Sequence, residues 1–61
     1  MSKKHFKAFA AALLNNRPGE NWDKRVQWNQ DVKAIAAECR QFNSNFDYHR
    51  FIDACGGLFN V

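Results

Sequence analysis

The sequence has only two cysteines, one proline and three glycines among its 61 residues, and it has no long run of apolar residues. Two cysteines are too few for the disulfide framework that stabilises small secreted domains, and no signal-peptide pattern precedes them. A membrane-spanning helix needs about 20 consecutive apolar residues, which this sequence lacks. We therefore expect an intracellular protein without a disulfide scaffold and without a membrane partner.

The length limits how much the chain can contain. Sixty-one residues leave room for a single helical domain, residues 1–61, and such a short chain buries only about 60% of its unfolded surface. Six Phe, two Trp and one Tyr are available for a dense core, because each aromatic side chain buries about 150–250 Å². A substrate cavity of several hundred Å³ would consume most of that core. We therefore expect a protein that is not an enzyme and has no cofactor.

Acidic residues are absent from the first 19 positions. This segment holds four basic residues, a net charge of +4, whereas residues 20–61 hold five basic and six acidic residues, a net charge of −1. Lysines in the first turn of a helix face the positive end of its dipole, which is unfavourable. Helix stability does not explain them, so either an anionic partner or solubility accounts for the basic N-terminus.

The first predicted helix covers residues 3–16. Its apolar positions are spaced by three and four residues, as in an amphipathic helix, and the lysines of this segment lie away from the apolar stripe or at its margin. The stripe consists of Phe6, Phe9, Ala10, Leu13 and Leu14. Pro18 disfavours helical geometry at Arg17, and Pro-Gly is a turn pair, so a loop is expected over residues 16–21.

The second predicted helix begins near Asn21 to Asp23, either of which can cap it, and continues to about Phe42. Apolar residues separated by 4, 3, 4 and 3 positions define the side of this helix that is expected to face inward, which we call the seam. Trp22 and Val26 extend a neighbouring apolar stripe. The seam consists of Trp28, Val32, Ile35, Cys39 and Phe42. At about 20 residues this helix would be roughly 30 Å long, the longest element and the one on which the others lie.

The third predicted helix is short and begins at an Asp47 cap. In that register Phe46 and Phe51 occupy the two positions of a hydrophobic staple. Ser44 and Asp47 also fit a capping box that would begin the helix three residues earlier, but only the Asp47 cap produces the staple. The expected buried face is Phe51, Ile52 and Cys55, and the residues expected to point outward or sideways are Tyr48, His49, Arg50 and Asp53.

The third helix is expected to end at Gly56 or Gly57. A glycine adopts the left-handed conformation just past a helix at little cost, and it would turn Leu58 and Phe59 back toward the core. The three helices together predict an all-α fold, a small three-helix bundle with a long central helix and a short C-terminal helix.

Several short segments resemble a group of bacteriophage proteins. The segments Gln41-Phe42-Asn43, Phe46-Asp47, Arg50-Phe51 and Ala54-Cys55-Gly56 are similar to the C-terminal half of short uncharacterised proteins encoded by bacteriophages and prophages. Lys4-His5-Phe6 and Trp28-Asn29 are also similar to that group. The resemblance implies a mobile-element origin and a location in the cytoplasm of the bacterial host cell. It implies no catalytic residues.

Two cysteines and two histidines have the composition of a Cys₂His₂ zinc site, but their spacing does not match one. They are Cys39, Cys55, His5 and His49. Zinc ligands arrive as closely spaced pairs, whereas these residues are at least six positions apart. Cys55 and His49 would project from different faces of one helix, which excludes a catalytic dyad within it. We expect both cysteines to be small buried apolar residues, with a disulfide or redox pair and a metal site as the alternatives.

Protein binding is the function that the remaining residues favour. Exposed Trp, Tyr and Arg side chains are typical of binding hot spots, although Trp22 could instead cover the core beneath the Pro18-Gly19 loop. We expect the chain to bind a host or phage protein stoichiometrically, as an inhibitor or modulator of a bacterial defence or regulatory complex. The candidate interaction surface is Lys3, Lys4, Lys7, Trp22, Tyr48, His49 and Arg50.

The alternative is a small DNA-binding regulator of the helix-turn-helix type. A net charge of +3 and a pI of about 9.2 fit nucleic acid. Against it, the third helix carries Asp47 and Asp53 and offers one arginine for base edges, and the lysines lie at the other end of the chain. A homodimer is also plausible, because it would add burial to a small core.

Overall fold

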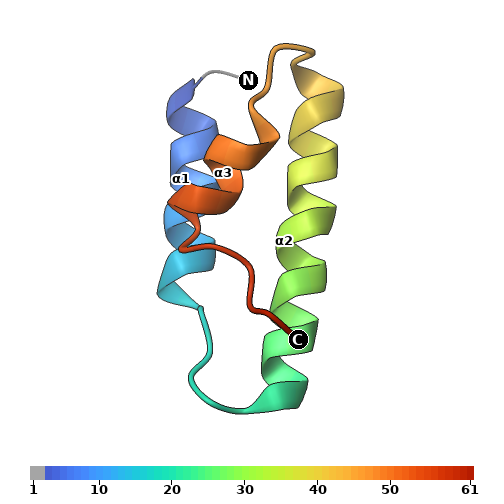
Figure 1. Ribbon diagram of the computed structural model, residues 1–61. Helices are drawn as coiled ribbons and strands as arrows, with labels where there is room; N and C mark the ends of the chain where they lie inside the picture. The colour runs from blue at the N-terminus through green and yellow to red at the C-terminus, as the bar shows by residue number, and fades with distance from the viewer. Residues whose placement is uncertain (1–2) are drawn as a thin grey trace.

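The computed structural model describes residues 3–61, so positions 1 and 2 of the predicted domain lie outside the described residues. Within this range the chain forms three helices, α1 (Lys3–Asn15), α2 (Trp22–Phe42) and α3 (Tyr48–Ala54), and no strand. The predicted all-α class is confirmed. Helices α1 and α2 run antiparallel to one another, and α3 lies across the space between them (Figure 1). Helix α3 packs against both.

The predicted loop after α1 is confirmed. The helix ends at Asn15, and the Nδ2 of Asn16 donates a hydrogen bond to the Ala12 carbonyl oxygen at 2.8 Å. The backbone N–H of Arg17 donates to the Leu14 carbonyl at 3.1 Å, just before Pro18. These bonds satisfy carbonyl groups that the last turn of a helix leaves without a partner.

Asparagine side chains mark both ends of α2. Asn21 is the N-cap, because its side-chain oxygen accepts a hydrogen bond from the backbone N–H of Lys24 at 3.0 Å. At the other end, the backbone N–H of Asn43 donates to Cys39 and its side-chain oxygen accepts from the N–H of Asn45 at 2.9 Å. The Asn43 side chain therefore competes with the helix for backbone hydrogen bonds, as expected where the helix ends after residue 42.

The start of α3 agrees with the Asp47 register. The Asp47 side chain accepts a hydrogen bond from the backbone N–H of Arg50 at 3.0 Å, which is the N-cap bond to the third helical residue. The Phe46 and Phe51 rings lie on either side of this cap with centroids 5.3 Å apart. The cap and the hydrophobic staple are both confirmed.

The end of α3 is a Schellman motif. The N–H of Gly57 donates to the Ile52 carbonyl and the N–H of Gly56 to the Asp53 carbonyl, both at 3.0 Å. Both glycines have positive φ, 102° at Gly56 and 85° at Gly57. The chain then reverses, and Leu58 and Phe59 pack against the core as predicted.

The buried seam of α2 differs from the prediction. Trp28, Val32 and Cys39 are buried, but the seam runs through Ala36, whereas Ile35 is 36% exposed and Phe42 is 65% exposed. The cause is the short third helix, which covers only the Ala36 side of α2. Among residues 3–61 the buried hydrophobic core is Phe6, Ala10, Trp28, Val32, Ala36, Cys39, Phe51 and Cys55.

The aromatic residues contribute less to the core than the composition predicts. Only Phe6, Trp28 and Phe51 are buried among residues 3–61; the others are half-buried or exposed. On α1 only part of the predicted apolar stripe is buried. Phe6 and Ala10 are buried, whereas Phe9 is 39% exposed and Leu14 is also exposed. The apolar surface therefore exceeds what three helices of these lengths can cover.

Candidate functional site

A basic cleft of about 620 Å³ lies between the N-terminal half of α1, the segment 43–47 and α3. Lys3 and Lys7 line it from α1 and Arg50 lines it from α3. Arg50 is more than 40 residues from either lysine in the sequence, but the packing of α3 against α1 brings the three cations to one opening. Two of the three lysines of the candidate interaction surface, Lys3 and Lys7, therefore share one site with its arginine.

Aromatic rings form the apolar wall of this basic cleft. The Phe6 and Phe46 rings meet edge to face with centroids 4.9 Å apart, and Phe46 in turn contacts Phe51. Ala10 and Ala54 complete the apolar lining. A surface of this kind accommodates a hydrophobic side chain next to an anionic group, because apolar burial and charge pairing occur side by side.

Asp47 is the carboxylate in the lining of the basic cleft. Its side chain is occupied as the α3 N-cap, where it accepts the hydrogen bond of the Arg50 N–H. Three cations and one carboxylate leave the lining with a formal charge of +2. A formal charge of +2, compared with +3 for the whole chain, is therefore concentrated at this one opening, which favours an anionic ligand.

The other candidate residues lie elsewhere. Lys4 and His49 are exposed but do not line the basic cleft. Tyr48 is half-buried, packs against the core and touches the His49 ring edge to face. Trp22 is 62% exposed at the start of α2, the end of the molecule opposite to the basic cleft, so it does not cover the core (Figure 1).

Arg17 is a basic residue whose role the sequence does not reveal. Its guanidinium lies over the Phe59 ring, 3.9 Å from the centroid, and its Nη2 donates to the Gly57 carbonyl at 3.1 Å. Arg25 approaches the same ring at 4.6 Å and donates to the Gly19 carbonyl. Two of the nine basic residues therefore hold the C-terminal segment in place. No spacing rule links Arg17 to a ring 42 residues later.

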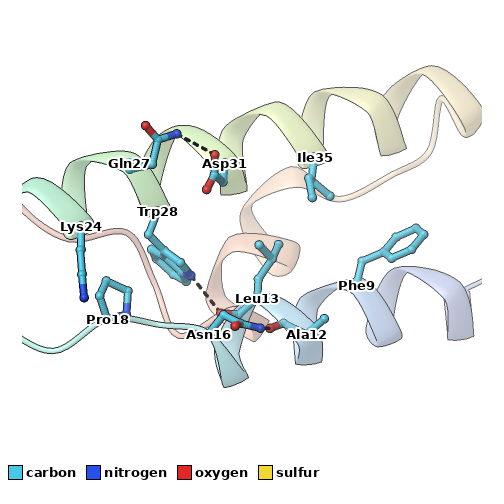
Figure 2. A pocket seen from close by; sticks show the side chains of 10 residues that line it. All are labelled: Phe9, Ala12, Leu13, Asn16, Pro18, Lys24, Gln27, Trp28, Asp31 and Ile35. Atoms are coloured by element: carbon cyan, nitrogen blue, oxygen red, sulfur yellow. Dashed lines mark hydrogen bonds between the residues drawn. The ribbon is translucent and has the colours of Figure 1, made fainter.

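A second concavity, which we call the open groove, lies between α1 and α2. It has a volume of about 420 Å³, and Figure 2 shows Phe9 of α1 and Ile35 of α2 projecting into it. Trp28 forms part of its floor, held by the hydrogen bond from its Nε1 to the Leu13 carbonyl at 2.9 Å. Its charged lining residues are Lys24 and Asp31, so it is electrically balanced.

Both cysteines are buried, as the sequence predicts, and both thiols are free. Burial raises the pKa of the Cys39 thiol and is the larger of two effects that raise the pKa of Cys55. The smaller effect on Cys55 is repulsion from Cys39 once that thiol has lost its proton. Raised pKa values keep these thiols protonated and poorly nucleophilic at neutral pH. Residues 3–61 contain no group of three or more His, Cys, Asp or Glu side chains that could hold a metal ion.

No family model, curated protein or solved structure matches this chain. Within residues 3–61, no helix combines the length and apolar character needed to cross a bilayer. The basic cleft and the open groove therefore stand on their geometry alone.

Proposed function

We propose that this chain is a small, non-enzymatic binding protein of bacteriophage type that acts in the bacterial cytoplasm and binds one host or phage protein stoichiometrically. In this proposal the three helices form a small bundle around the long helix α2 and present the basic cleft to the partner. The observation that carries the proposal is the convergence of Lys3, Lys7 and Arg50 around an aromatic wall.

The chemistry of the basic cleft indicates the kind of segment it binds. The Phe6, Phe46 and Phe51 rings fit a hydrophobic side chain, and the three cations fit carboxylates that flank it. An acidic protein segment with an exposed apolar residue supplies both. Inhibition or modulation of a bacterial defence or regulatory complex is the specific form of the proposal, and its support is the resemblance to phage-encoded proteins.

The second candidate is a DNA-binding regulator, and one observation favours it. The lysines of α1 lie beside α3, the helix that would enter the major groove, although they are distant in sequence. A phosphate backbone would use these cations but leave the aromatic wall unoccupied. Helix α3 also has only seven residues and carries Asp53. Protein binding would use both the cations and the aromatic wall of the basic cleft, whereas DNA binding would use only the cations.

The test uses the purified chain to capture proteins from bacterial lysate with and without nuclease. The cleft variant Lys3→Glu/Lys7→Glu/Arg50→Glu reverses the cations at the opening. The control variant Lys4→Glu/Lys33→Glu/Arg40→Glu makes the same charge change at exposed residues outside it. We expect a captured protein that survives nuclease treatment, forms a complex of fixed ratio when purified, and is lost with the cleft variant only.

Capture that disappears on nuclease treatment would reject protein binding in favour of nucleic acid. In that case binding to duplex DNA at low salt should be measurable, and its affinity should fall steeply as salt increases, because phosphate contacts release counterions. The cleft variant should then lose more affinity for DNA than the control variant, because the phosphates would contact the three cations of the basic cleft. A chain that captures nothing under either condition would contradict both candidates.

A further inference from the structure

The segment that follows α3 is held on α2 by contacts of the kind that recognise a peptide. In Figure 1 this segment, drawn in red, leaves α3 and comes to lie beside α2. The backbone hydrogen bonds of α3 end where the Gly57 N–H donates to the Ile52 carbonyl. Residues 58–61 belong to no helix or strand, and the side chain of Asn29 binds the backbone of Phe59. Side chains, rather than secondary structure, therefore hold these residues in place.

Two guanidinium groups and an indole contact the Phe59 ring. Arg17 and Arg25 lie over it, 3.9 Å and 4.6 Å from its centroid. The Trp28 ring meets it edge to face, with the two centroids 5.5 Å apart. A cation is attracted by the negative face of an aromatic ring, so this arrangement favours an aromatic side chain over an aliphatic one.

Asn29 recognises the backbone of the same residue. Its side chain is only 7% exposed, and its amide nitrogen and oxygen both bind the Phe59 backbone. A buried amide without such partners is costly. The N–H and C=O that it binds are present in every residue except proline, so Asn29 accepts any extended segment, as a sheet edge does. We call these contacting residues the Phe59 site: Arg17, Arg25, Trp28 and Asn29.

Two glycines join the bound segment to α3. Gly56 and Gly57 both have positive φ, and a Cβ at Gly57 would meet nothing within 4 Å. Glycine adopts positive and negative φ at similar cost. The segment can therefore leave the Phe59 site through a change of backbone angles at Gly57, while the backbone hydrogen bonds within α3 remain.

We propose that the Phe59 site is a recognition site for an extended protein segment with an aromatic side chain, and that the chain's own residues 57–61 occupy it in cis. A partner segment of the same chemistry displaces residues 57–61 and makes the same two amide bonds and ring contacts. The tethered segment competes as if it were present at about 1 mM, so it excludes weak ligands. The inference is independent of the proposed function, because it uses none of the cations of the basic cleft.

The test measures the binding of a synthetic peptide with the sequence of residues 56–61, blocked at both ends, by nuclear magnetic resonance titration. The variant Phe59→Ala of the whole chain removes the competing ring but keeps the Phe59 site. We expect the peptide to bind this variant at least about tenfold more tightly than the unmodified chain. The same peptide with alanine in place of its phenylalanine should bind the variant at least about tenfold more weakly, because ring burial and the cation–π attraction are lost.

Further substitutions in the Phe59→Ala chain locate the bound peptide. Asn29→Ala should weaken peptide binding about tenfold or more, because the peptide backbone loses both partners. Gln30→Ala, at the exposed neighbouring position, is the matched control and should leave the affinity unchanged. Lys3→Glu/Lys7→Glu reverses two cations of the basic cleft and should also leave it unchanged.

A measurement on the unmodified chain keeps the test decisive if a variant fails to fold. Excess peptide should weaken the nuclear Overhauser effects between the Phe59 and Trp28 rings, and effects between Trp28 and the peptide ring should replace them. Equal affinity for the unmodified chain and the Phe59→Ala variant would overturn the proposal, as would peptide contacts at the basic cleft instead of at Trp28 and Asn29. An unmodified chain whose spectrum does not change at about 5 mM peptide, well above the effective concentration of the tethered segment, would also overturn it.

Discussion

The side-chain amide of Asn29 and the backbone of Phe59 form two hydrogen bonds. The Nδ2 of Asn29 donates to the Phe59 carbonyl, and the Phe59 N–H donates to the Oδ1 of Asn29, each at 2.9 Å. The amide satisfies the donor and the acceptor of one residue at once, as a neighbouring β-strand would. Asn29 is only 7% exposed, so this pair holds the C-terminal segment on α2.

The first prediction concerns this pair. Asn29→Ala leaves the backbone groups of Phe59 without their partners, and we expect the free energy of unfolding to fall by about 2 kcal/mol or more. Because the Phe59 ring packs edge to face on Trp28, the native tryptophan fluorescence should change as well. Urea unfolding measures the first effect. Gln30→Ala, at the exposed neighbouring position, is the control and should change stability by less than about 0.5 kcal/mol.

The second prediction is a graded effect of alanine at three glycines. A Cβ at Gly56 would lie 2.9 Å from the Leu14 Cδ1 and 3.0 Å from the Arg17 Cδ, in addition to the strain of a positive φ. At Gly57 the φ is positive but the space is open, and at Gly19 nothing lies within 4 Å. We expect losses of roughly 2–4 kcal/mol at Gly56, about 1–2 at Gly57 and less than about 0.5 at Gly19.

Thermal unfolding of these three variants checks the order. Equal losses at Gly56 and Gly57 would show that backbone strain alone matters and that the contact with Leu14 is easily relieved. A loss at Gly19 comparable to that at Gly57 would contradict the role assigned to the Schellman motif.

Local signals explain why the helix ends could be predicted from the sequence. The Asp47 cap, the Phe46–Phe51 staple and the stop at Gly56 each involve residues within a few positions of one another. Long-range packing explains the misses. A seam with heptad-like spacing shows which side of α2 is apolar, but not that a seven-residue helix would cover Ala36 and leave Ile35 exposed.

In the candidate site too, the residue types could be predicted from the sequence, but their long-range arrangement could not. The sequence identified Lys3, Lys7 and Arg50 as members of one candidate interaction surface, but it could not show which of that surface's residues lie together, because no local rule connects α1 with α3. Their common cleft follows only from the packing of those helices. Arg17 and Asn29 were missed because their partners, Gly57 and Phe59, lie in a segment without periodicity.

The third prediction concerns the shape of the Arg17 side chain. Arg17→Lys keeps the charge but removes the planar group that stacks on Phe59 and the fork that reaches the Gly57 carbonyl. We expect a loss of about 1–2 kcal/mol in the free energy of unfolding, of which the stacking contributes about half. Arg40→Lys, the same exchange at an exposed position of α2, should cost less than about 0.5 kcal/mol. Similar losses in the two variants would show that the Arg17 contacts are energetically unimportant.

The fourth prediction is a loss of stability in alkaline solution that depends on the buried thiols. Burial raises the pKa of Cys39 and Cys55 above the ordinary thiol value of 9.0. Below pH 9 both the folded and the unfolded chain keep these protons, so the thiols contribute no pH dependence. Above pH 9 the unfolded chain releases them first. The unfolded state is thereby favoured, and stability falls by up to about 1.4 kcal/mol per pH unit for each thiol until the folded pKa is reached.

Lysine and tyrosine side chains also titrate in this range, so the informative quantity is a difference between two proteins. The variant Cys39→Ala/Cys55→Ala retains all of those groups and lacks only the thiols. Replacing two buried thiols lowers its stability at pH 7, and we expect the wild-type advantage in urea unfolding to shrink as the pH rises from 9 to 10. An advantage that stays constant over this range would mean that the thiols reach solvent readily. In that case both should react with a thiol reagent at pH 8 as fast in the folded chain as in the unfolded one.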